Sequence, residues 1–190
     1  MRIGYGFDSH EFRPGIPLKV GGVALAHDRG LGGHSDGDVL LHALTDALLG
    51  AIAAPDIGML FPPSDPKWKG ADSVIFLREA LKRVGDAGYA VANVDASLIL
   101  AAPKIGPHSA AIRSRVAELL GVDCGCVGLK AKTPEGLNLD NAALAHVVVL
   151  IESIKVTRSP KPAKGAGRFN PAQDKPARRL AKRSPRKRRS

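Results

Sequence analysis

Two histidines and one aspartate have the chemistry of a metal site. Asp8 and His10 stand two residues apart in an extended segment, so their side chains point to the same side of it. His42 lies in a stretch whose apolar residues recur at helical spacing, which holds its imidazole on a rigid element. One carboxylate and two imidazoles make a three-ligand zinc site with an open position. Taken singly, an Asp-x-His triplet is more often a surface feature, and a helical histidine is as often a satisfied side chain.

A second group of polar residues suits phosphate. Glu135 is a hard oxygen donor of the kind that holds Mg²⁺ between phosphates, and Thr133 lies close to it. His34 and Ser35 precede the helix of His42, where hydroxyl and backbone N–H groups suit phosphate oxygens. Two metals acting on a diphosphate indicate phosphoryl transfer. The alternatives are a metal-dependent phosphohydrolase, and a domain that has lost its catalytic activity and serves only to present a basic tail.

The helix that carries His42 is the element around which the chain is organised. Ser35 or Asp36 can cap its start. Asp38, His42 and Asp46 follow at intervals of four residues, which places them on one side of the helix. That side is a rigid base for metal or phosphate chemistry.

The patterns around this helix predict an α+β domain. Alternating or β-branched apolar residues indicate four main strands, and helical periodicity indicates three helices. We expect strands at 2–7, 91–102, 127–133 and 143–154, a hairpin around Gly21-Gly22, helices over the second half of 33–50, 73–88 and 107–120, and irregular loops at 26–33 and 51–66. The apolar run at 143–154 also fits a helix by pattern alone. The economical packing is a four-stranded mixed sheet with the helices on one face, which leaves the other face for self-association.

Charge divides the chain of 190 residues into two parts. The net charge is +10, with 28 Lys and Arg against 18 Asp and Glu, and residues 158–190 hold thirteen of the basic residues but one acid. Residues 1–157 are therefore close to neutral and have the composition of a domain. We expect 158–190 to be a disordered basic tail, whose only partner would be a weakly bound polyanion.

The two cysteines, Cys124 and Cys126, indicate a reducing compartment. They are one residue apart, which is neither the usual zinc spacing nor a favourable disulfide. The chain also has no apolar signal core near Met1 and no apolar run of membrane-spanning length. These features predict a cytoplasmic protein with no membrane partner.

Short motifs in a fixed order carry a family resemblance. They are Arg2-Ile3-Gly4, Gly6-Phe7-Asp8-Ser9-His10, Gly21-Gly22-Val23, His34-Ser35-Asp36-Gly37-Asp38, His42 to Gly50, Asp56-Ile57-Gly58, Phe61-Pro62, Asp65-Pro66, Lys69 to Ser73, Asn93-Val94-Asp95, Ala102-Pro103-Lys104 and Lys130-Ala131. In these motifs the chain resembles the 2-C-methyl-D-erythritol 2,4-cyclodiphosphate synthases of the non-mevalonate isoprenoid pathway. The resemblance covers roughly residues 1–155 and leaves the tail outside.

The resemblance implies a phosphorus–oxygen lyase that converts 4-diphosphocytidyl-2-C-methyl-D-erythritol 2-phosphate to the 2,4-cyclodiphosphate and CMP. It implies zinc, or another divalent transition metal, on Asp8, His10 and His42, and Mg²⁺ or Mn²⁺ at Glu135. It implies that His34 and Thr133 stabilise the transition state. The residues that it assigns to the substrate are Asp8, His10, His34, Ser35, Asp56, Ile57, Gly58, Phe61, Asp65, Lys104, Lys132, Thr133 and Glu135.

The resemblance also implies a homotrimer with active sites between subunits, in agreement with the uncovered sheet face. The segment 100–106, with Lys104, would receive the cytidine of a neighbouring subunit's substrate. The chain departs from the family after Glu135, where Leu139 and Ala142 replace a phenylalanine and an arginine that line the trimer axis. This departure argues against binding of isoprenoid diphosphates in that cavity, although Lys132 could supply a replacement charge.

Overall fold

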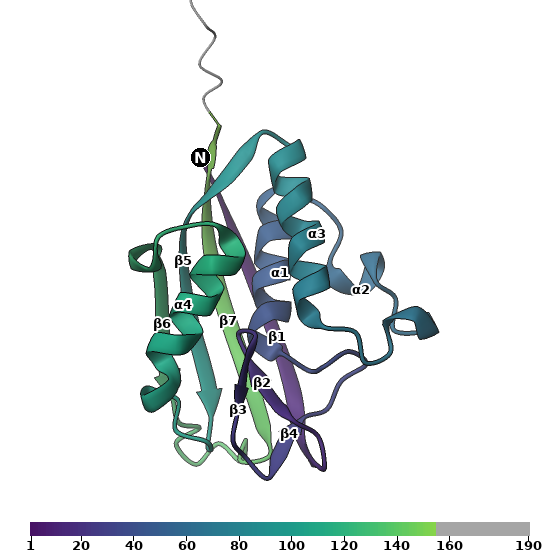
Figure 1. Ribbon diagram of the computed structural model, residues 1–190, viewed down its shortest axis with the longest axis vertical. Coiled ribbons are helices and arrows are strands. Elements are labelled where there is room, and N and C mark those ends of the chain that lie inside the picture. The colour runs from purple at the N-terminus through teal and green to yellow at the C-terminus, as the bar shows by residue number, and fades with distance from the viewer. Residues whose placement is uncertain (155–190) are drawn as a thin grey trace, which may run out of the picture. The chain divides into compact units, whose positions relative to one another are not determined.

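The computed structural model describes residues 1–154, which form one mixed sheet covered by helices (Figure 1). The elements are β1 (Arg2–Pro14), β2 (Leu18–Val20), β3 (Val23–Leu25), β4 (Arg29–Leu31), α1 (Val39–Ala51), α2 (Ile57–Leu60), α3 (Ser73–Asp86), β5 (Tyr89–Leu100), α4 (Ser109–Leu120), β6 (Val127–Lys132) and β7 (Ala142–Ser153), with short 3₁₀ turns at Pro66–Trp68, Gly106–His108 and Cys124–Cys126. The predicted α+β class is confirmed. The predicted tail lies outside the described residues.

The sheet has five strands in the order β4-β1-β7-β5-β6, not the four that the sequence predicts. The missed strand, β4, lies in the segment predicted as a loop and pairs with the end of β1, Phe12 opposite Leu31. Three residues with a central glycine are too short to leave an alternating pattern. The β5–β6 pair is parallel and the other pairs of this sheet are antiparallel. The predicted hairpin is confirmed as β2 and β3.

Strand β1 continues well past its predicted end at residue 7. The strand β7 beside it is twelve residues long and pairs with β1 from Arg2 to Glu11, so the ladder runs on through polar side chains. Asp8 and His10 therefore lie inside β1 and not at a strand end, opposite Ala145 and Ala143. The run at 143–154, which fits a helix by pattern, is this central strand.

Helices α1, α3 and α4 lie on the same face of the sheet, as predicted (Figure 1). Helix α1 sits unusually close to β1 because β1 carries glycine where the helix crosses it. A Cβ placed on Gly6 would lie 1.9 Å from the carbonyl oxygen of Ala43, and one on Gly4 would lie 1.8 Å from that of Ala47. The missing side chains allow the helix backbone to rest directly on the strand.

The opposite face of the sheet exposes large apolar side chains. Ile3, Tyr5 and Phe7 of β1 are 70%, 58% and 45% exposed, and Val148 of β7 is 43% exposed. A contiguous apolar surface of this kind is typical of an interaction site.

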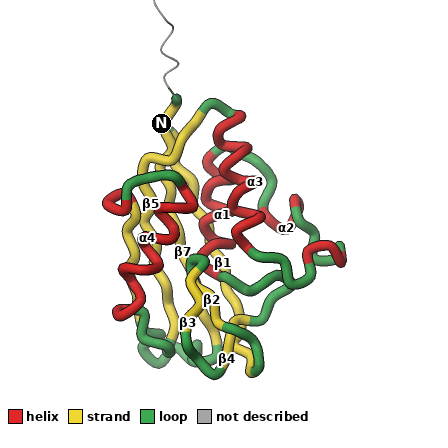
Figure 2. Tube along the Cα trace, viewed as in Figure 1, coloured by secondary structure: helices red, strands yellow, loops and turns green. Residues whose placement is uncertain are grey.

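Between α1 and α3 the chain is mostly loop, as Figure 2 shows. The sequence predicts an irregular loop over 51–66, but α2 forms one helical turn within it, because Asp56 caps that turn by accepting a hydrogen bond from the Met59 N–H (2.8 Å). The cap of α1 is also one that the sequence does not identify. It is Asp38, which accepts from the Leu41 N–H, and not Ser35 or Asp36.

Among residues 1–154, none of the helices is both long enough and apolar enough to span a membrane.

Candidate active site

Asp8, His10 and His42 converge at one point, as the sequence predicts. One donor atom from each lies within 4.8 Å of the others. Asp8 Oδ2 is 3.0 Å from His42 Nδ1 and 3.0 Å from His10 Nδ1. Asp8 and His10 come from alternate positions of β1, and His42 comes from α1. They meet because α1 packs closely against the glycines of β1.

These three residues fit a divalent transition metal. His10 Nδ1 is buried and makes no hydrogen bond, although it lies beside the Asp8 carboxylate. A buried ring nitrogen without a partner is costly, and a bound cation would satisfy it. A carboxylate oxygen and two imidazole nitrogens are also the donor set that zinc prefers, with the fourth position open.

Local electrostatics keep Asp8 ionised. Burial opposes the charge on this carboxyl, but the close contacts with the His10 and His42 rings and the positive charge of these rings when protonated outweigh it and lower the pKa of Asp8 to about 2. Asp8 therefore carries its negative charge across the neutral pH range and can attract a cation.

A cavity of about 190 Å³ opens beside this cluster. The sequence predicts seven of the residues that line it, namely His10, His34, Ser35, His42, Ile57, Gly58 and Phe61, but not Pro63, Trp68 and Phe76. Phe76 is an aromatic residue within the helix predicted at 73–88, one position before the buried Leu77, and its presence beside that position was the available signal. Trp68 packs edge-on against Phe61 and Phe76, with ring centroids 5.0 and 5.7 Å apart.

Asp38, His42 and Asp46 have separate tasks, although the sequence groups them on one side of the helix. Asp38 is completely buried and binds the turn of the β2–β3 hairpin, while His42 faces Asp8. Asp46 accepts a hydrogen bond from the Ile57 N–H (2.8 Å), so it anchors the loop that lines the cavity. The structure brings Asp56 and Asp65 to the same loop as caps of its two helical turns.

The remaining predicted residues form a second group at the far edge of the sheet. Lys104, Lys132, Thr133 and Glu135 line a cavity of about 560 Å³ between the end of β6 and the segment 100–109. The Thr133 hydroxyl donates to Glu135. Strands β7 and β5 separate β6 from β1, which amounts to about 14 Å at the usual strand spacing. Within one chain, the second group is therefore separate from Asp8, His10 and His42.

A third hollow, of about 300 Å³, is lined by the two residues at which the sequence departs from the family motif, Leu139 and Ala142. Its other lining residues include Ser9, His10, Asn141 and Glu11, which carries a carboxylate. Ala142 stands where an arginine would give the wall positive charge. Among residues 1–154, no lysine or arginine lines this hollow, and Lys132 lines the 560 Å³ cavity instead.

Comparison with known proteins gives one answer. The model of the YgbB family matches residues 1–152. The chain belongs to the YgbB family. A relative from Koribacter versatilis (strain Ellin345), named 2-C-methyl-D-erythritol 2,4-cyclodiphosphate synthase, is 68% identical over 152 residues, which are 80% of this chain and 98% of that protein. The chloroplastic enzyme of that name from Arabidopsis thaliana is 54% identical over 154 residues, which are 80% of this chain and 67% of that protein.

Solved structures of YgbB-family synthases have the same fold. One, titled 2C-methyl-D-erythritol-2,4-cyclodiphosphate synthase, is 45% identical, has a TM-score of 0.76 and covers 80% of this chain and 100% of its own. Another, titled as the form bound to CDP, is 43% identical with the same TM-score and the same coverage. The family predicted from the sequence motifs is confirmed, and with it the enzyme class, a phosphorus–oxygen lyase of isoprenoid biosynthesis.

Proposed function

We propose that the chain converts 4-diphosphocytidyl-2-C-methyl-D-erythritol 2-phosphate to 2-C-methyl-D-erythritol 2,4-cyclodiphosphate and CMP. The observation that carries this proposal is the convergence of Asp8, His10 and His42 beside a cavity that also holds His34 and Ser35. An oxygen of the 2-phosphate attacks the β-phosphorus, and the bond from that phosphorus to the CMP oxygen breaks. Because the substrate supplies its own nucleophile, the protein's task is positioning and charge stabilisation.

Asp8, His10 and His42 would hold a zinc ion or another divalent transition metal. Such an ion, when bound, polarises a phosphoryl oxygen as a Lewis acid. The unpartnered Nδ1 of His10 supports this assignment. The ionised Asp8 supports it as well, because its negative charge attracts a cation to the site.

The rest of the first cavity would hold the phosphates and the erythritol. His34 and Ser35 are at its wall and would contact phosphate oxygens, Ser35 through its hydroxyl and His34 through Nδ1, since Nε2 of His34 contacts the Asp65 carbonyl (3.3 Å). The segment Asp56, Ile57 and Gly58 would hold the erythritol hydroxyls, with Phe61 and Asp65 on the same loop. The hydrogen bond from the Ile57 N–H to Asp46 fixes this loop against α1, so the cavity is formed before the substrate arrives.

The second cavity would hold the nucleotide end of the substrate. Lys104 and Lys132 supply positive charge for its phosphates, and the 560 Å³ volume accommodates a nucleoside. Thr133 would donate its hydroxyl to the transferred phosphate. The Glu135 carboxylate is an oxygen donor suited to Mg²⁺ or Mn²⁺ between the phosphates.

The chain would act as a homotrimer, because the two cavities lie at opposite edges of one sheet while a single substrate must reach both. Adjacent copies can bring one cavity of each into contact around the exposed apolar face formed by Ile3, Tyr5, Phe7 and Val148. A cytoplasmic location is supported by Cys124 and Cys126, which are both free thiols.

Incubation with the authentic substrate and Mg²⁺ tests the reaction. We expect the cyclic diphosphate and CMP in equal amounts. Release of inorganic phosphate would indicate a phosphohydrolase, and an unchanged substrate would indicate a body that has lost its reaction.

Complementation between inactive variants tests the shared site. His42→Ala removes a ligand from the first cavity, and Glu135→Gln removes a charge from the second. Each variant alone should be inactive, and only His42→Ala should lose zinc. Refolded together in equal amounts, they should regain activity at about a quarter of the sites, because random trimers contain interfaces with both halves intact. Complete inactivity of a mixed trimer of normal size would contradict a site shared between copies.

A further inference from the structure

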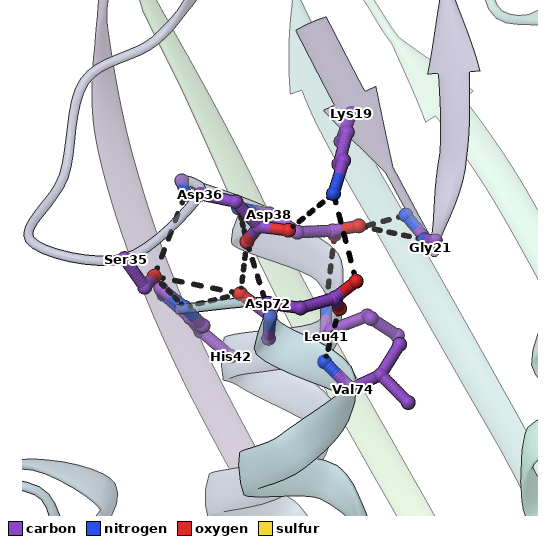
Figure 3. A network of polar contacts seen from close by, with 12 residues as sticks. Lys19, Gly21, Ser35, Asp36, Asp38, Leu41, His42, Asp72 and Val74 are labelled. Atoms are coloured by element: carbon purple, nitrogen blue, oxygen red, sulfur yellow. Dashed lines mark hydrogen bonds and ion pairs between the residues drawn. The ribbon is translucent and has the colours of Figure 1, made fainter. Parts of the chain in front are cut away.

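A hydrogen-bond chain lies behind His42, on the side away from Asp8. The Nε2 atom of His42 is 2.9 Å from the hydroxyl oxygen of Ser73 and 2.9 Å from that of Ser35. Ser73 is the first residue of α3 and is completely buried. Its hydroxyl also contacts Asp36. Asp36 in turn binds Lys19 at 3.0 Å (Figure 3).

Proton count fixes the direction of the hydrogen bonds that run from Asp36 through Ser73 to His42. The Asp36 carboxylate, ionised beside Lys19, can only accept, so the single hydroxyl proton of Ser73 points toward it. The Ser73 oxygen then has only lone pairs left for His42. Nε2 of His42 must therefore carry the proton and donate it.

The same proton count decides which nitrogen of His42 is free. A neutral imidazole has one N–H, so a protonated Nε2 leaves a lone pair on Nδ1. Nδ1 lies 3.0 Å from Asp8 Oδ2, and because the ionised carboxylate can only accept, a neutral His42 needs a bound cation in place of a proton between these two atoms. The chain from Asp36 through Ser73 thus aims a lone pair of His42 at the point where Asp8 and His10 also converge.

Two loops hold this chain in place. The Asp36 N–H donates to the Ala71 carbonyl (3.0 Å), and the Gly70 N–H donates to the His34 carbonyl (2.7 Å). The start of α3 is thereby tied to the segment that precedes α1. Lys19 also reaches Asp72 at 3.7 Å, so it bridges both loops from the hairpin side (Figure 3).

We propose that Ser73 and Asp36 are positioning residues for the metal centre, which set the tautomer and ring orientation of His42 so that Nδ1 is its ligand atom. This inference rests on the metal site of the proposed function and assigns its supporting residues. Such outer partners of a ligating histidine commonly change metal affinity 10- to 100-fold.

Zinc affinity, measured by competition with a chromophoric chelator, tests the inference. Ser73→Ala should weaken zinc binding by about 10-fold or more. Asp36→Asn should weaken it as well, although it conserves shape. Lys19 and the N–H groups of Asp38 and Ser73 all donate to Asp36, so an amide cannot serve every partner. With the amide oxygen toward Lys19, the NH₂ faces Ser73, which reverses the hydroxyl and favours the Nδ1–H form of His42.

Thr45→Val is the matched control. It removes another fully buried hydroxyl, which donates to the Leu41 carbonyl (2.7 Å) in the same helix and is not part of the hydrogen-bond chain at His42. Zinc affinity should be unchanged in this variant even though it loses a buried hydrogen bond. The absorption of bound Co²⁺ provides a second readout, since a changed ligand geometry at His42 should alter its visible bands in Ser73→Ala but not in Thr45→Val.

The double variant Asp36→Asn with Ser73→Ala separates a relay from two independent effects. If Asp36 acts through Ser73, the double variant binds zinc no more weakly than Ser73→Ala alone. Unchanged zinc affinity in Ser73→Ala and Asp36→Asn, with zinc lost in His42→Ala, would overturn this inference and leave the metal site standing. Zinc retained by His42→Ala would instead overturn the metal site itself. If Ser73→Ala does not fold, the zinc affinity of Asp36→Asn decides between these outcomes, because that substitution keeps the size and shape of the side chain.

Discussion

The contact between α1 and β1 at Gly6 gives the sharpest test of how the fold makes the site. A methyl group on residue 6 would lie 1.9 Å from the carbonyl oxygen of Ala43 and 2.6 Å from the N atom of Ala47. Both atoms belong to the backbone of α1, so no side chain can turn aside. Acceptable contacts begin near 3 Å, and Gly6→Ala therefore forces helix and strand apart by about 1 Å.

Overpacking of this kind lowers the free energy of unfolding by about 1–3 kcal/mol. The upper end applies here because the new methyl group overlaps the backbone of two residues. In a domain of this size each kcal/mol shifts the melting temperature by about 2–4 °C. We expect metal-free Gly6→Ala to melt roughly 6–12 °C lower than the parent protein. The displacement also separates His42 from Asp8, so zinc affinity should fall, and a shift of about 1 Å is enough to lower turnover roughly 100-fold.

Gly50→Ala is the control, because it makes the same chemical change on α1 toward the same strand. There the new methyl lies 3.6 Å from the Tyr5 carbonyl oxygen, an ordinary contact. Alanine in place of glycine in a helix stabilises by about 0.5–1 kcal/mol. Calorimetry should therefore give opposite signs for the two variants. Equal melting temperatures would show that α1 does not rest on the glycines of β1.

Three further predictions concern separate parts of the chain. Asp38→Ala leaves the N–H groups of Gly21, Gly22 and Leu41 without their acceptor, so chemical denaturation should show a loss of about 3 kcal/mol or more, and a loss below 1 kcal/mol would contradict this role. The pKa of Asp8 is lowered to about 2 from an ordinary value of 3.8, so its ionised form adds about 2 kcal/mol to the free energy of unfolding of the metal-free protein. This contribution is present above about pH 4 and is lost as the pH falls toward 2. In urea titrations the stability difference between the parent protein and Asp8→Asn should shrink over that interval, and a constant difference would refute the prediction. Truncation after residue 156 should leave turnover nearly unchanged and should remove any binding of polyanions. In the full chain this binding should weaken steeply with salt. If the truncated protein assembled normally but lost turnover, the tail would take part in the reaction.

The sequence by itself determined the types of side chain available for chemistry and the elements that carry them. Asp8 and His10 alternate on a strand and His42 stands on an amphipathic helix, and each of these patterns is local, with a period of about two or 3.6 residues. The motif order also determined the family, since spacing along the chain survives without any knowledge of the fold. Strand and helix types were therefore predicted well, except where a segment such as β4 is too short to have a period.

Only the tertiary structure decided which of these residues meet. Asp8 and His42 are 34 residues apart, and their contact depends on missing side chains at Gly4 and Gly6, whose effect appears only when α1 is laid on β1. The strand order decided that Glu135 lies far from Asp8 in one chain, because β7 and β5, although distant in sequence from each other, insert between β1 and β6. It also brought Asp36 and Ser73 behind His42. Hydrogen bonds between distant segments follow from how whole elements pack, and no local pattern of residues encodes that packing.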